Sequence, residues 1–243
     1  MKKLIKYIKL LRYGLQFRTM MIMTVIFIGM GILFEATAIF SSLFGMSLGG
    51  LYMGLIGAYM YQLVATVAVA KVVNASPMKK ELLTTAPVLM ATIVSLITYT
   101  IFILVRIFYT MGIRLPKEAG LYPDAEAMLV MSILYCGGLV FVLMVYLPVS
   151  VKQYAAGVAI LGAYIVFMLV IGNGVKMTAF MVDKYHVLVD AFGKQTTLVL
   201  VIAASYVMLI LGSLVACLIN RLTIRKEYSE FTYRNALKQA AAK

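Results

Sequence analysis

The sequence has little of what builds a metal site or a disulfide scaffold. It holds two cysteines and one histidine in 243 residues. Cys136 and Cys217 both lie inside apolar runs, where a cysteine usually serves as a small core residue. His186 has no other histidine or cysteine near it in sequence, so we expect a solvated side chain rather than a ligand. The sequence therefore predicts no metal site, no disulfide and no cofactor held by this chain.

The motifs of nucleotide-binding proteins and of common hydrolases are also missing. No GxxxxGK[ST] string occurs, so the chain lacks the loop with which P-loop ATPases hold nucleotide phosphates. No HExxH string, paired catalytic carboxylates or nucleophile with a nearby base lies in an apolar run. We therefore do not expect an enzyme. A secondary transporter is disfavoured too, because it usually carries more buried polar residues and paired broken helices, commonly in a longer chain.

Acidic residues are scarce: 9 stand against 22 basic ones, which gives a net charge of +13. The basic residues lie at the ends of apolar runs, and this pattern is typical of a membrane surface rather than of nucleic-acid binding. Hydrophobic residues make up 63% of the chain and the mean hydropathy is +0.99, which excludes a soluble globular domain. The first apolar run is too long and starts too late for a cleavable signal peptide. Membrane lipid is therefore an expected partner and nucleic acid is not.

Six apolar runs are long enough, at 1.5 Å per residue, to cross about 30 Å of hydrocarbon as helices. They lie near 19–40, 48–72, 88–111, 127–147, 154–172 and 197–219. No alternating pattern of about ten residues suggests a barrel, so helices are the expected spanning structure. The predicted fold is an all-α, polytopic integral membrane protein with one transmembrane domain over 1–243. It would comprise an interfacial helix (1–18), six transmembrane helices (19–219) and a cytoplasmic tail (220–243).

The first eighteen residues predict a basic amphipathic helix. One face would hold Lys2, Lys6, Lys9 and Gln16, and the other Leu4, Ile8, Leu11 and Leu15. Such a helix lies in the headgroup plane of an anionic leaflet. A mitochondrial transit peptide is the competing interpretation, which the absence of serine and the membrane span that follows directly make less favourable.

A second amphipathic helix is predicted within 173–196, between the fifth and sixth runs. Its apolar face would hold Met177, Phe180, Met181, Leu188, Ala191 and Phe192. The opposite face would hold Asp183, His186, Asp190 and Lys194. This pattern indicates a helix that lies at, or dips into, the outer membrane interface.

The distribution of Lys and Arg predicts the orientation. With the N-terminus inside, Arg106 would lie within the third run and most other basic residues in inner segments. The outer segments would hold only Arg114, Lys117, Lys176, Lys184 and Lys194. Because inner segments of membrane proteins are enriched in Lys and Arg, we expect a multi-pass protein of the cell membrane with both termini in the cytoplasm.

Two charged residues, Glu35 and Arg106, lie deep within apolar runs. Both would sit roughly 25–27 Å from the cytoplasmic end of their helices. An isolated charge at that depth costs several kcal/mol, so an ion pair between them is attractive. The alternatives are that each side chain reaches the outer surface separately, or that Glu35 takes part in translocation.

Small residues recur at a spacing of four in two runs. Gly50, Gly54 and Ala58 form one such set, and Gly212 and Ala216 form another. This spacing favours close helix packing and says little about function.

The stretch 74–87, NASPMKKELLTTAP, interrupts two apolar runs on the predicted cytoplasmic side. Ser76 followed by Pro77 is a helix-start signal, and Pro87 disfavours helix at Ala86. We therefore expect a short separate helix with Met78, Leu82 and Leu83 exposed, against the alternative of a solvated loop.

The chain resembles the permease subunits of ABC-2 type ABC transporters over essentially its whole length, in architecture more than in any invariant signature. In that family a loop of the form LP-[IV]-S-[RK]-[KR]-E follows the second span. This chain has a similar string there, Ser76-Pro77-Met78-Lys79-Lys80-Glu81-Leu82. Ser76 replaces the leucine of the family pattern, and the serine of that pattern is missing. A closer string, Leu147-Pro148-Val149-Ser150-Val151-Lys152, follows the fourth run and could mark a second cytoplasmic contact.

The resemblance implies an exporter permease that pairs with a second permease and with separate ATP-binding subunits, which would hold ATP and magnesium. The implied ATPase-coupling residues are Ser76, Pro77, Met78, Lys79, Lys80, Glu81, Leu82 and Leu83, and those of the second contact are Pro148, Ser150 and Lys152. The alternative from a different class is a non-transporting membrane scaffold or sensor subunit.

Overall fold

A computed structural model describes residues 9, 17–38, 48–67, 79–112, 125–170, 175–223 and 234. The elements within these ranges are all helices, and no strand occurs among them. They are α2 (Phe17–Ala38), α3 (Leu48–Val67), α5 (Lys79–Gly112), α6 (Ala125–Lys152), α7 (Tyr154–Val170), α8 (Val175–Phe192) and α9 (Lys194–Leu222). The all-helical prediction is confirmed for this part of the chain. It follows from apolar runs whose backbone groups can only be satisfied internally in lipid.

Helices α2, α3, α5, α6, α7 and α9 occur where the six apolar runs predict them. Four of them contain a stretch long and apolar enough to cross a membrane: Phe17–Glu35, Lys80–Phe108, Glu126–Lys152 and Lys194–Leu222. These four stretches indicate a membrane-embedded protein. A crossing by α3 and α7, and thus the count of six spans, stays a prediction.

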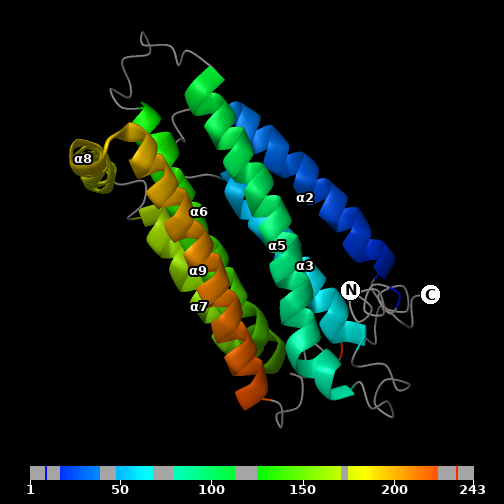
Figure 1. Ribbon diagram of the computed structural model, residues 1–243. Helices are drawn as coiled ribbons and strands as arrows, with labels where there is room; N and C mark the ends of the chain where they lie inside the picture. The colour runs from blue at the N-terminus through cyan, green and yellow to red at the C-terminus, as the bar shows by residue number, and fades with distance from the viewer. Residues whose placement is uncertain are drawn as a thin grey trace.

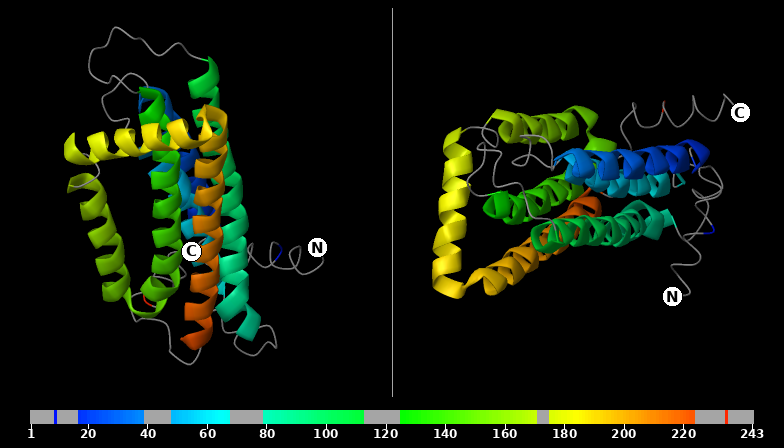
Figure 2. Two further views of the ribbon diagram at one scale, coloured as in Figure 1. Left: turned by 60° about the vertical axis from the view of Figure 1, so that its left-hand side comes forward. Right: turned by 90° about the horizontal axis from the view of Figure 1, so that it is seen from above.

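The six helices run side by side, and α8 lies crosswise over one end of the bundle (Figures 1 and 2). Helix α6 is the most buried of the four candidate spans and α2 the least. The large core lies mainly among α3, α5, α6 and α9, where Phe102, Ile133 and Leu209 are almost fully buried. The helix predicted within 173–196 is therefore present as α8, and its place at a membrane interface stays a prediction.

Helix α5 corrects the prediction that a short helix ends before Pro87. It runs unbroken from Lys79 to Gly112 with Pro87 inside it. Proline in a helix interior costs about 3 kcal/mol, because it removes one hydrogen bond and its ring crowds the preceding turn. Packing of α5 against α3, which buries Leu82 and Ala86 just before the proline, offsets this cost.

Helix α6 corrects a second boundary in the same way. The sequence predicts that it ends near residue 147, yet it continues through Pro148 to Lys152. A tight connection at Gln153 leads directly into α7, with the Gln153 N–H donating to the Val149 carbonyl oxygen at 2.6 Å. The string 147–152 is therefore the last part of a helix rather than a loop.

Close helix contacts confirm the packing role predicted for the small residues. A Cβ on Gly212 would lie 3.0 Å from the Phe141 Cα, and one on Gly54 would lie 2.9 Å from a Leu143 methyl group. Both glycines therefore let their helices approach α6 closely.

Two predicted segments lie mostly outside the described residues. Of the interfacial helix predicted over 1–18, only Lys9, Phe17 and Arg18 are described, and of the predicted tail only 220–223 and Arg234.

Candidate functional site

The structure brings Glu35 of α2 and Arg106 of α5 together. Arg106 Nε lies 2.7 Å from Glu35 Oε2, and the two side chains are 1% and 3% exposed. At this distance the two side chains form a close, buried ion pair. Neither side chain reaches the surface of the described bundle, so the alternative of two separate surface charges does not hold within this chain.

Two further features surround the pair. The carboxylate of Glu35 lies against Gly49 in the first turn of α3, where a Cβ would overlap it. A helix N-terminus carries a partial positive charge, so this position stabilises the anionic carboxylate. The Arg106 guanidinium carbon lies 5.3 Å from the centre of the Phe102 ring. This cation–π contact adds stability to a desolvated arginine.

Part of the segment implied to couple to an ATPase forms the start of α5. Ser76, Pro77 and Met78 lie outside the described residues, and the backbone of Lys79 begins α5. Lys80 is exposed and Glu81 is half-buried.

Leu82 corrects the prediction of exposed apolar anchors. Its side chain is 2% exposed and packs in a cluster with Leu63, Val64 and Met90. Leu83 is half-buried against the same cluster. The reason is the continuity of α5: a helix that passes through Pro87 lies along α3, and this places Leu82 between the two helices.

The second predicted contact is largely closed to a partner. Pro148 and Ser150 are buried within α6, which corrects their assignment to an accessible loop, and Lys152 is half-buried. A Cβ on Gly157 of α7 would lie 2.5 Å from the Ser150 Cβ, so the two helices touch there. Gln153 and Tyr154 are the exposed residues of this connection.

A buried polar cluster at the same end of the bundle is not predicted by the sequence. Asn220 of α9 is 1% exposed. Its side-chain amide donates to the Thr84 carbonyl oxygen at 2.9 Å, and its carbonyl oxygen accepts from the Tyr61 hydroxyl at 2.9 Å. One buried side chain thus joins α3, α5 and α9. The sequence signal for it is an asparagine directly after the sixth apolar run, a position that the sequence-based prediction includes in the polar tail.

The opposite end of the bundle carries an exposed polar cluster. Glu126 in the first turn of α6 accepts from the Tyr185 hydroxyl of α8 at 3.1 Å and from Lys194 Nζ of α9 at 3.0 Å. Gly193 joins α8 to α9 with a φ of 79°, a conformation that favours glycine. The lone histidine, His186, is exposed on α8. The cluster therefore anchors the crosswise helix to the bundle.

The described residues contain no group of three or more His, Cys, Asp or Glu side chains that could hold a metal ion. Cys136 is buried in the main core, and Cys217 is half-buried against it.

Comparison with known proteins adds no relative: no family model matches the chain, and neither the curated proteins nor the solved structures contain a match.

Proposed function

We propose that the chain is the membrane-spanning permease subunit of an ABC exporter and that separate ATP-binding subunits drive it. The observation that supports this proposal is architectural. Six adjacent helices pack into one bundle, and an amphipathic helix lies across one end between the fifth and the sixth. This is the arrangement that the resemblance to ABC-2 permeases implies.

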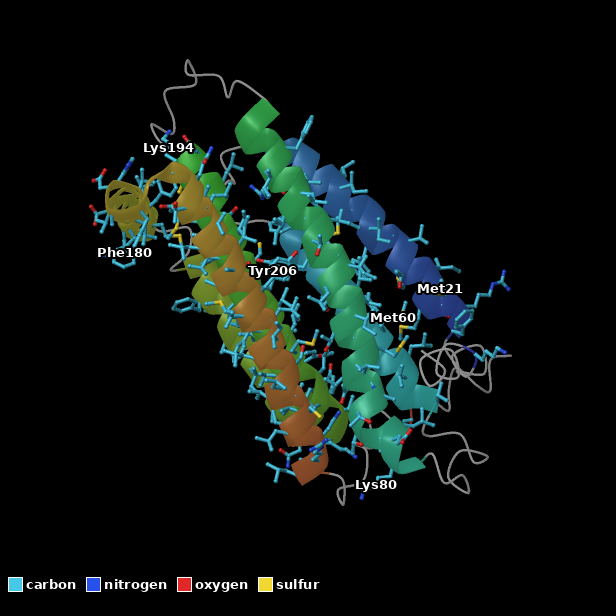
Figure 3. The ribbon with its side chains drawn as sticks, viewed as in Figure 1. Met21, Met60, Lys80, Phe180, Lys194 and Tyr206 are labelled. Carbon is cyan, nitrogen blue, oxygen red and sulfur yellow. The ribbon has the colours of Figure 1, made fainter. Side chains whose placement is uncertain are left out.

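Under this proposal, three connections at one end of the bundle face the cytoplasm and receive the ATPase. They are the start of α5, the α6–α7 connection and the end of α9 (Figures 1 and 3). Their exposed residues are Lys80, Gln153, Tyr154, Arg221 and Leu222. Leu222 is 75% exposed, and Tyr154 is 40% exposed. These two supply apolar contact area, which usually carries binding energy, while Lys80 and Arg221 direct the approach of a partner.

The ATPase, with its ATP and magnesium, would be a separate protein, and a second permease would complete the pathway. Closure of the ATP-binding subunits would push on these three connections, and the helices would rearrange. Export and a cell-membrane location with cytoplasmic termini belong to the same proposal.

The test is co-expression with a P-loop ATPase encoded next to this chain, followed by co-purification and an ATPase assay in nanodiscs. We expect a stable complex that the combined Tyr154→Asp and Leu222→Asp substitutions weaken at least tenfold, because two apolar anchors are lost. Lys184→Glu, at the far end on α8, is the matched control and should leave binding unchanged.

If no P-loop ATPase is encoded nearby, or if the purified pair neither binds nor couples ATP hydrolysis to the chain, the transporter proposal fails. A membrane scaffold or sensor subunit then becomes the better interpretation, and a neighbouring kinase or protease gene would favour it. Leu82→Asp is unsuitable for this experiment, because it places a charge in a packed cluster and disturbs folding.

A further inference from the structure

The first two turns of α5 are separated from the rest of the helix by Pro87. Proline has no N–H, so the Leu83 carbonyl oxygen loses its usual partner within the helix. The Thr84 and Thr85 hydroxyls donate back to the carbonyl oxygens of Lys80 and Glu81, at 2.7 and 3.5 Å. Threonine back-bonding of this kind often bends helices. Figure 1 shows that the lower end of α5 turns aside from the helix axis. We call residues 79–86 the foot of α5.

The foot packs separately from the main core. Leu82 and Ala86 belong to a small cluster with residues of α3 and with Met90. The large core, which includes Phe102 and Leu209, is a different cluster. Movement of the foot would therefore open the small cluster while the main core stays packed.

Asn220 is the polar side chain that holds the foot from α9. Its amide donates to the Thr84 carbonyl oxygen, one residue beyond the carbonyl that Pro87 leaves without an intrahelical partner. The Tyr61 hydroxyl donates to the other side of the same amide and fixes its orientation. This contact lies where the hydrogen bonding of α5 is weakest, and it is shielded from solvent.

We propose that the foot of α5 is a hinged segment that swings about Pro87, and that Asn220 is the latch that keeps it closed. When the latch is formed, movement at the start of α5 is passed to the end of α9. When it opens, the foot moves on its own and Leu82 is uncovered. This device is built into the chain and does not rest on the identity of any partner.

The test measures how fast a cysteine at position 82 reacts with a maleimide. The background is the full chain in detergent with Cys136 and Cys217 replaced by alanine, carrying Leu82→Cys. Adding Asn220→Leu should raise the reaction rate about tenfold, because loss of a buried hydrogen-bonding partner shifts an equilibrium by about that factor. An unchanged rate overturns the proposal.

Two control positions separate a local opening from general loosening. Lys80→Cys is already exposed, so its rate should not change when Asn220 is replaced. Leu209→Cys reports on the main core, where the parent side chain is 0% exposed, and its rate should also stay low. An equal rise at positions 82 and 209 would mean that Asn220 merely stabilises the whole bundle.

Two smaller variants keep the test decisive if Asn220→Leu does not fold. Tyr61→Phe removes the hydroxyl that donates to the Asn220 carbonyl oxygen, and Asn220→Ala removes the amide that donates to Thr84 without adding bulk or charge. Each should raise the rate at position 82, with the larger effect for Asn220→Ala. Pro87→Ala restores the missing N–H, and adding it to either variant should return the rate toward that of the parent. If Pro87→Ala has no such effect, Pro87 is not the hinge.

Discussion

The ion pair between Glu35 and Arg106 could be predicted from the sequence, but its full surroundings could not. Equal expected depth suggested that they meet, and the structure places them 2.7 Å apart in a buried site. The sequence could not show that the start of α3 also approaches, because the position of Gly49 depends on tertiary packing. The site thus combines an arginine and a helix N-terminus around one carboxylate.

Breaking one partner should leave a charge without compensation in a medium of low dielectric. We expect Glu35→Gln and Arg106→Gln each to destabilise the chain by about 3–5 kcal/mol. The double substitution should cost less than the sum of the two, and a double-mutant cycle of thermal unfolding in detergent measures the difference. Strict additivity would show that the pair contributes no coupling energy.

Gly49 and Gly29 offer a matched comparison at the residue scale. A Cβ on Gly49 would overlap the Glu35 carboxylate, whereas one on Gly29 would meet nothing within 4 Å. We expect Gly49→Ala to lower the free energy of unfolding by about 1–3 kcal/mol, since the carboxylate must move. Gly29→Ala should be neutral or slightly stabilising, because alanine favours helix. Melting temperatures of the two variants provide the check, and equal values would contradict the close approach.

At the scale of elements, the positions of the helices could be predicted and two of their ends could not. Apolar runs locate α2, α3, α7 and α9 to within a few residues. The sequence predicts helix ends before Pro87 and near residue 147, but Pro87 and Pro148 both lie inside helices. A local preference against helix is outweighed there by packing along a whole helix, which the sequence of one turn does not contain.

The candidate site shows the same limit. Leu82 looked exposed because the stretch around it is polar, yet it packs against α3. Asn220 looked like the start of a tail, yet it is buried among three helices. Both assignments depend on which helices are neighbours, and this is a property of the fold rather than of a local pattern.

Leu82 and Lys80 provide a comparison within the foot of α5. Leu82→Ala removes a buried side chain and should cost about 2–4 kcal/mol through lost packing and the cavity left behind. Lys80→Ala changes an exposed residue and should stay within about 0.5 kcal/mol. Thermal unfolding of the purified variants measures both. A small effect of Leu82→Ala would show that the foot is not packed in solution.

At the scale of the whole molecule, the apolar exterior is as informative as the core. Large apolar side chains are exposed along α2, α5 and α9, for example Val25, Leu104 and Leu214. A soluble monomer rarely exposes apolar surface of this extent, and hydrocarbon is the solvent that suits it. The charged residues Lys80 and Lys194 lie at opposite ends of the bundle (Figure 3).

Single cysteines at positions 80 and 184 should become labelled from opposite sides of the membrane. The excess of basic residues predicts that position 80 faces the cytoplasm and position 184 the outside. An impermeant maleimide applied to intact cells should therefore label position 184 alone, and position 80 should react only after lysis. Labelling of position 80 in intact cells would reverse the proposed topology.

The buried stripe of α9 restricts how that helix can move. Its polar members, Thr197, Ser205, Ser213 and Asn220, are interleaved with the apolar residues Val201, Leu209 and Ala216. The Ser213 hydroxyl accepts from Thr92 at 2.9 Å, while Asn220 bonds to Tyr61 and Thr84. A slide of one helical turn, about 5.4 Å, would set apolar side chains against these polar groups. Piston motion of α9 is therefore blocked by its own register, and any rearrangement that includes it has to be a tilt shared with α6.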